Sequence, residues 1–169
     1  MILKIGLGGG CHWCTEAVFQ SLKGVLRVEQ GWVSSEGKDD SFSEAVIVQF
    51  DAARIQLKEL IEVHLYTHQS TSDHSMRKKY RSAIYYFSQD QSAESSSILK
   101  VLQAEFDERI ITQVLPFKNF EPSREEITNY YYTNPQKPFC EKYIAPKLQL
   151  LLERFSSIVK TDKIKTMRA

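Results

Sequence analysis

Residues 2–24, ILKIGLGGGCHWCTEAVFQSLKG, decide the start of the fold. The apolar run at 2–7 is typical of a buried strand, and the glycines at 8–10 mark a turn. Apolar residues then recur about once per helical turn, and Gly24 is a helix stop signal. The stretch therefore predicts a strand, a glycine turn and a helix, with two cysteines, a histidine and a tryptophan at the helix start.

The rest of the chain continues this alternation. Strand patterns occur at 25–33, 42–50, 82–88 and 111–120. Helical spacing of apolar residues occurs at 55–67, near 98–106 and near 148–155. Ser123 and Glu126 form a capping-box pattern ahead of another helix. Because only a loop joins the two central strands, the order is βαββαβ, which predicts the α+β class and a ferredoxin-like split βαβ plait with additional C-terminal helices.

Length and charge limit the possible partners. No repeat or linker divides the 169 residues, so we expect one domain over 1–155 and a polar, solvated tail over 156–169 that frays. Lys plus Arg number 22 against 21 Asp plus Glu, which gives no reason to expect nucleic acid, an anionic membrane surface or assembly. Without a signal-like or membrane-spanning apolar run, the chain is expected to be soluble and cytoplasmic. The balanced charge leads us to expect a monomer.

The cysteines indicate redox chemistry. Cys11 stands where the first helix begins, and unpaired N–H groups there favour a thiolate. Cys14 is three residues later on the same helical face, so the two sulfurs can reach disulfide distance. Two alternatives stay open: a glycine turn followed by a small apolar residue, and a zinc site completed by other ligands.

One carboxylate stands in an apolar row. Strand alternation places Glu44 on the same face as Phe42, Val46, Val48 and Phe50. Burial disfavours the charged form, so Glu44 would hold a proton near neutral pH, unless it is a strand-end glutamate that reaches solvent. A thiolate beside a protonated carboxyl suits attack on an atom whose oxygen must be protonated to leave, as in sulfoxide reduction.

GCHWCTE at 10–16, followed by AVFQSLKGV, resembles the GCFWG-type active-site motif of class A peptide-methionine sulfoxide reductases, which reduce methionine-S-sulfoxide. The similarity continues in the family's order through SEAVIVQFD, KYRSAIYY and NYYYTNPQKPFCEKYIAPKL. It covers most of residues 4–150, so the resemblance implies that 1–155 is a single catalytic domain. It also implies a thioredoxin-like dithiol as reductant and no metal or organic cofactor.

The resemblance assigns roles residue by residue. Cys11 corresponds to the nucleophile that attacks the sulfoxide sulfur and becomes a sulfenic acid, and Glu44 to the acid that protonates the sulfoxide oxygen. Tyr80 corresponds to a tyrosine that hydrogen-bonds this oxygen, and Trp13 to the tryptophan of the methyl-binding pocket. Cys14 corresponds to the second cysteine of GCFWC members, which resolves the sulfenic acid.

Several positions depart from the family pattern. His12 replaces the usual pocket phenylalanine and Trp32 a usual tyrosine, so both are expected to enclose the substrate methyl group, and His12 adds a group that titrates. Ser75 stands at the position of a family aspartate, which leaves the neighbouring Asp73 and His74 as candidates for substrate binding.

Other interpretations stay open. Cys140 corresponds to a cysteine of some members and is either a second resolving thiol or a buried bystander. A general thioredoxin-like thiol–disulfide oxidoreductase would explain Cys11 and Cys14 but gives Glu44 no role. A non-enzymatic module could bind oxidised methionine, or hold zinc through the two cysteines and a third ligand.

Overall fold

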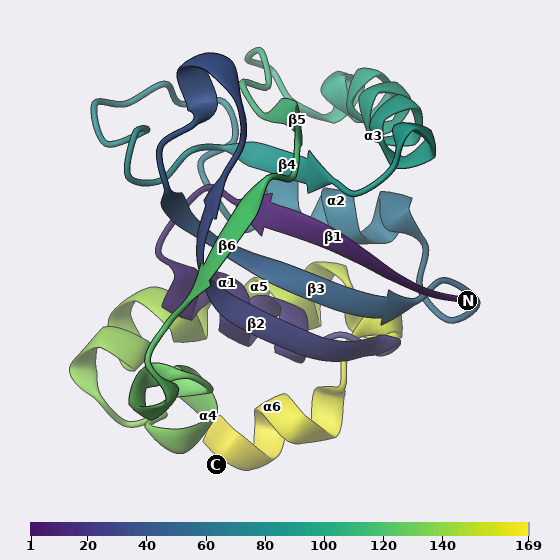
Figure 1. Cartoon of the computed structure of the whole chain (residues 1–169). Helices are drawn as coiled ribbons and strands as arrows, with labels where there is room; N and C mark the ends of the chain where they lie inside the picture. Colours follow the sequence, from purple (N-terminus) through teal and green to yellow (C-terminus); the bar gives the residue numbers. More distant parts are fainter. Residues whose placement is uncertain (169) are drawn as a thin grey trace.

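The computed structural model describes the backbone of residues 1–168 and the side chains of residues 1–164. Its α-helices and strands begin in the order β1 (Ile2–Gly8), α1 (His12–Gln20), β2 (Val25–Ser34), β3 (Ser43–Asp51), α2 (Leu57–Tyr66) and β4 (Ala83–Tyr86). These four strands lie at the centre of one sheet in the order β4-β1-β3-β2, and each neighbouring pair is antiparallel. The predicted α+β class and the βαββαβ plait are therefore confirmed (Figure 1).

The two faces of the sheet pack against different layers. In β3, Val46 and Val48 enter the main core, while Ala45 and Ile47 enter a smaller cluster on the opposite face. This alternation is the period-two geometry of a strand. The main core also contains apolar residues of α1, α2 and the C-terminal helices (Figure 1). Because both faces of β3 are covered, a side chain at the end of this strand can lie in a nearly dry site.

The strand predicted at 111–120 is in fact two strands at opposite edges of the sheet. After α3 (Gln89–Leu102), β5 (Gln113–Pro116) pairs in parallel with β4, and β6 (Asn119–Pro122) pairs antiparallel with β2. Between them the chain crosses the end of the sheet, held by bonds from the Phe117 and Lys118 N–H groups to the carbonyls of Tyr86 and Ser34, at 3.0 and 3.1 Å. Six strands result.

The capping-box prediction is wrong. The Ser123 hydroxyl does not cap a helix but donates to the Gln30 side-chain oxygen at 3.0 Å. A 3-10 turn (Glu125–Ile127) follows, and the short helix α4 (Tyr130–Thr133) begins after Asn129, whose φ of 55° is left-handed. Asparagine tolerates this conformation better than most residues.

The chain beyond α4 packs on the main core. A π-helical turn, η4 (Cys140–Ile144), leads into α5 (Ala145–Arg154), and α6 (Thr161–Arg168) follows. The prediction of a solvated tail is wrong for residues 156–164: the Val159 and Ile164 side chains are fully buried, and Val159 bridges to Leu22. Residue 169, the end of the predicted tail, lies outside the described residues. In residues 1–168 no helix is long and apolar enough to span a bilayer.

Candidate active site

Cys11 is the residue that precedes α1, at the exit of the glycine turn. Its carbonyl accepts the N–H groups of Cys14 and Thr15 at 3.1 and 3.2 Å, so the first helical turn begins directly at this residue. The thiol is partly exposed. It therefore lies within reach of a substrate, and the Trp13 and Cys14 backbone N–H groups at the helix start hydrogen-bond it and lower its pKa.

Cys14 makes Cys11 the more acidic of the two thiols. A hydrogen bond from the Cys14 thiol is the largest cause that lowers the Cys11 pKa, and the Trp13 N–H adds to it; burial and the nearby Glu44 charge oppose the shift. The same hydrogen bond, together with burial, raises the pKa of Cys14 far above its usual value. All three cysteines are free thiols. The arrangement matches a nucleophile with an adjacent resolving thiol.

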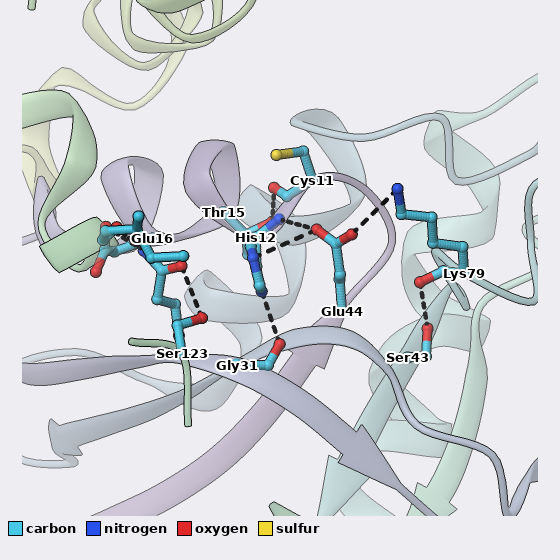
Figure 2. A network of polar contacts seen from close by, with 11 residues as sticks. Cys11, His12, Thr15, Glu16, Gly31, Ser43, Glu44, Lys79 and Ser123 are labelled. Carbon is cyan, nitrogen blue, oxygen red and sulfur yellow. Dashed lines mark hydrogen bonds and ion pairs between the residues drawn. The ribbon is translucent and has the colours of Figure 1, made fainter. Parts of the chain in front are cut away.

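Glu44 lies next to Cys11 through His12. The His12 backbone N–H donates to Glu44 Oε1 at 3.1 Å, and His12 Nε2 lies 3.6 Å from the same oxygen. Glu44 is 7% exposed, so the alternative that it reaches solvent as a strand-end residue is wrong. Phe42, which was expected in the same strand row, is 46% exposed and lies outside β3. Figure 2 shows the carboxyl between His12 on one side and Lys79 on the other.

Lys79 is a contact that the sequence did not indicate. Its Nζ lies 3.8 Å from Glu44 Oε2 and 5.1 Å from the ring centre of Tyr80. A hydrogen bond with Tyr80, reinforced by the Glu44 charge, raises the pKa of this ammonium group. The loop between α2 and β4, which carries Lys79, is fixed to β3 because the Lys79 carbonyl accepts a hydrogen bond from the Ser43 hydroxyl at 2.9 Å (Figure 2). Lys79 therefore contacts both Glu44 and the predicted site residue Tyr80.

His12 and Trp32 form one wall of the site. Trp32 is directly opposite Glu44 in the β2–β3 register, and cross-strand partners share a face of the sheet. The His12 ring packs edge-on against Trp32 with ring centres 5.0 Å apart. The sequence suggested this enclosure, but the hydrogen bond between His12 Nδ1 and the Gly31 carbonyl, at 2.7 Å, depends on a strand 19 residues away and was not foreseen.

Trp13 faces a different aromatic group. It stacks on Tyr130 with ring centres 4.2 Å apart and lies edge-on to Phe139 at 5.3 Å. The buried Glu16 carboxylate sets this geometry by accepting the backbone N–H groups of Asn129 and Tyr130, at 2.8 and 3.0 Å. Burial, partly offset by these bonds, raises the Glu16 pKa. The C-terminal segment therefore supplies the outer wall beside Trp13.

A buried support holds the glycine turn. His64 Nε2 bonds the Gly8 carbonyl at 2.7 Å, and Arg77 Nη1 donates to the Gly9 carbonyl at 2.9 Å. A methyl group on Gly9 would come within 2.4 Å of His68 Cδ2, so this position requires glycine. Burial lowers the pKa of His64 to about 4, which keeps the ring neutral at physiological pH. Arg77 was not singled out from the sequence because it lies in an unperiodic polar loop.

Asp73 and His74 are not brought to Cys11. Asp73 lines a separate cavity of about 610 Å³ whose lining includes Arg77 and Arg81 but neither Cys11 nor Glu44. His74 Nδ1 accepts the Met76 N–H at 3.2 Å within its own loop. The described contacts thus give neither residue a place beside the nucleophile.

Cys140 is fully buried in the same core cluster as Cys14. Burial raises the pKa of the Cys140 thiol. Among the side chains described, no three His, Cys, Asp or Glu residues are grouped to hold a metal ion. The zinc alternative therefore has no third ligand in that part of the chain.

Comparisons with known proteins agree on one family. A family model described as peptide methionine sulfoxide reductase matches residues 3–158. The peptide methionine sulfoxide reductase MsrA of Chromobacterium violaceum is 34% identical over 172 residues, covering 92% of this chain and 98% of that protein. Two crystal structures of Mxr1 from Saccharomyces cerevisiae are also similar. The unusual oxidized form has 28% identity, a TM-score of 0.65 and coverage of 82% and 86% of the two chains. The complex with Trx2 has 23% identity, a TM-score of 0.60 and coverage of 74% and 83%, and shows likeness of fold.

Proposed function

The chain belongs to the peptide methionine sulfoxide reductase family, and from that premise we propose that it reduces methionine-S-sulfoxide, free or in proteins, through a sulfenic acid on Cys11. One observation carries the assignment of residues. The buried Glu44 carboxyl accepts the N–H of the residue that follows Cys11, at 3.1 Å. We therefore assign the Glu44 carboxyl as the proton donor in the reaction of Cys11, a thiol whose pKa is lowered.

The first step transfers oxygen from substrate to enzyme. The Cys11 thiolate attacks the sulfoxide sulfur, Glu44 gives its proton to the sulfoxide oxygen, and the sulfur–oxygen bond breaks. Methionine leaves, and the hydroxyl group remains on Cys11 as a sulfenic acid. The Cys11 sulfur is oxidised by two electrons and the substrate sulfur is reduced by two.

The second step converts the Cys11 sulfenic acid into a disulfide. The Cys14 thiol attacks the Cys11 sulfenic acid, its proton leaves with the hydroxyl group as water, and a Cys11–Cys14 disulfide forms. A thioredoxin-like dithiol then reduces this disulfide by exchange and is itself oxidised. Mxr1 has been crystallised in complex with Trx2, which supports this class of partner for a protein of the same fold.

The substrate methyl group is proposed to lie between two aromatic walls. His12 and Trp32 supply one wall, and Trp13, covered by Tyr130, supplies the other. Tyr80 is assigned to hydrogen-bond the sulfoxide oxygen, with its neighbour Lys79 beside Glu44. No substrate role is proposed for Asp73 or His74.

Cys140 is a second candidate for the resolving thiol, because it lies in the same buried core cluster as Cys14.

The cysteines and the charge balance also support a cellular setting. Three free thiols suit the reducing cytoplasm, and the near balance of 22 basic and 21 acidic residues supports a monomer that binds neither nucleic acid nor membrane.

The test is an activity assay on the separate S and R epimers of methionine sulfoxide with dithiothreitol as reductant. We expect turnover of the S epimer only, its loss in Cys11→Ser and a fall of about 100-fold or more in Glu44→Gln, the usual contribution of a general acid. A wild-type rate in Cys11→Ser would refute the proposal. Reduction of insulin disulfides without turnover of sulfoxide would favour the thiol–disulfide oxidoreductase alternative.

A further inference from the structure

His12 is held in one orientation. Its Nδ1 lies 2.7 Å from the carbonyl oxygen of Gly31, and a carbonyl only accepts hydrogen bonds. Nδ1 therefore carries a hydrogen whether the ring is neutral or charged. The ring is 4% exposed and rests edge-on against Trp32. Only Nε2 is left to gain or lose a proton.

That free nitrogen faces Glu44. Nε2 lies 3.6 Å from Oε1, and both side chains are buried. This distance is suited to an ion pair but exceeds a direct hydrogen bond, so proton transfer needs an approach of about 0.5 Å or one bridging water. The proton can thus lie on Glu44 with His12 neutral, or on His12 with Glu44 ionised, without a change in net charge.

We propose that His12 and Glu44 share the proton that sulfoxide reduction consumes, and that the imidazole returns it to the carboxyl between turnovers. This inference rests on the proposed function. In each cycle Glu44 gives its proton to the sulfoxide oxygen and becomes a carboxylate. Because the pair shares one proton, His12 is neutral at this point. When the Cys11 thiol, released by disulfide exchange, ionises again, His12 Nε2 takes up its proton and the resulting imidazolium passes it to the Glu44 carboxylate.

The surrounding charges explain why a second proton carrier is useful. A cation and a hydrogen-bond donor both approach the Glu44 carboxyl: Lys79 Nζ lies 3.8 Å from Oε2, and the His12 backbone N–H donates to Oε1 at 3.1 Å. The Glu44 charge raises the Cys11 pKa, and the His12 charge lowers the Glu16 pKa, so the pair is coupled to both neighbours. A paired imidazole keeps one proton in the site to a higher pH than Glu44 alone beside Lys79.

The first test compares single-turnover rates of methionine formation between pH 5.5 and 9.5 in wild type, His12→Phe and His12→Asn. The phenylalanine keeps the aromatic wall, and the asparagine keeps a donor for Gly31; neither has a titrating nitrogen. In both variants the alkaline limb of the pH–rate profile should move to lower pH by about one unit. The loss of rate relative to wild type should therefore be about tenfold greater at pH 8 than at pH 6. Profiles that overlay the wild-type profile after scaling would overturn the proposal and leave His12 as a wall.

The second test needs no change at His12. The ring ¹⁵N resonances of His12 are titrated by NMR in wild type and in Glu44→Gln, with His74, whose described contacts do not include Glu44, as internal control. His12 should protonate at a pH lower by about one unit in Glu44→Gln, because the anionic partner is gone. Equal titrations would overturn the shared proton. Failure of the proposed function would instead appear as a wild-type protein that reduces neither epimer.

Discussion

The acidity of Cys11 should depend on the hydrogen bond donated by Cys14. This bond is the largest cause that lowers the Cys11 pKa. Cys14→Ala removes the donor, whereas Cys14→Ser keeps a hydroxyl in the same place. A hydrogen bond to a charged group contributes about 1.5–3 kcal/mol, and 1.36 kcal/mol corresponds to one pKa unit. Cys14→Ala should therefore raise the Cys11 pKa by about 1–2 units, and Cys14→Ser by clearly less.

The assay is the pH dependence of iodoacetamide alkylation at Cys11, followed by mass spectrometry of its peptide under reducing conditions. Cys14 and Cys140 are buried and their pKa values are raised, so neither should react in the same pH range. The thiolate fraction, and with it the alkylation rate, should reach half of its plateau at a higher pH in Cys14→Ala. Equal midpoints in wild type and both variants would refute the role given to the Cys14 hydrogen bond.

Two other predictions concern buried charges. Glu16→Gln should lower the free energy of unfolding in urea by about 1–3 kcal/mol at pH 7, because one backbone N–H of Asn129 or Tyr130 loses its partner; the exposed Glu36→Gln should change it little, and equal losses would contradict this account. Since burial raises the Glu16 pKa above its unfolded value, the stability that is linked to protonation of Glu16 is complete below the unfolded pKa and is lost as pH rises through the folded pKa, a pH dependence that Glu16→Gln should lack. The partly buried Lys147 ammonium donates to the Thr67 carbonyl, and its charge acts to lower the Cys14 pKa. Lys147→Met should slow disulfide formation about tenfold, the effect of one pKa unit, and should slow the first methionine burst less, because the ammonium is coupled to Cys14 first and to Cys11 second; Lys147→Arg should recover both. An unchanged rate of disulfide formation would exclude this effect.

The sequence predicted those parts of the fold that depend on hydrophobic periodicity and turn residues within one segment. The apolar strand, glycine turn and helix of residues 2–24 require only period and turn chemistry, and Glu44 was placed on the face of Val46 and Val48 by strand alternation. The split of 111–120 into two strands depends on which edges of the sheet lie nearby. That information is not contained in the segment itself.

The missed contacts join residues that are far apart in the chain. Ser123 and Glu126 have the spacing of a capping box, but the Ser123 hydroxyl finds the buried Gln30, 93 residues away. Lys79 contacts Glu44 because the Ser43 hydroxyl and the Glu44 backbone N–H both bond the Lys79 carbonyl and hold the loop that carries Lys79 against β3. Val159 and Ile164 lie in a polar tail with the four polar residues 160–163 between them, a spacing that fits neither the helical nor the strand period from which burial could be predicted.

The central claim is that Cys11 receives the oxygen of the substrate. The direct measurement uses the Cys14→Ser, Cys140→Ser double variant, mixed with one equivalent of methionine-S-sulfoxide and then with dimedone, which traps sulfenic acids. Mass spectrometry should find the dimedone adduct on the Cys11 peptide in an amount equal to the methionine formed. Methionine formed without an adduct on Cys11, or an adduct elsewhere in the chain, would contradict the account.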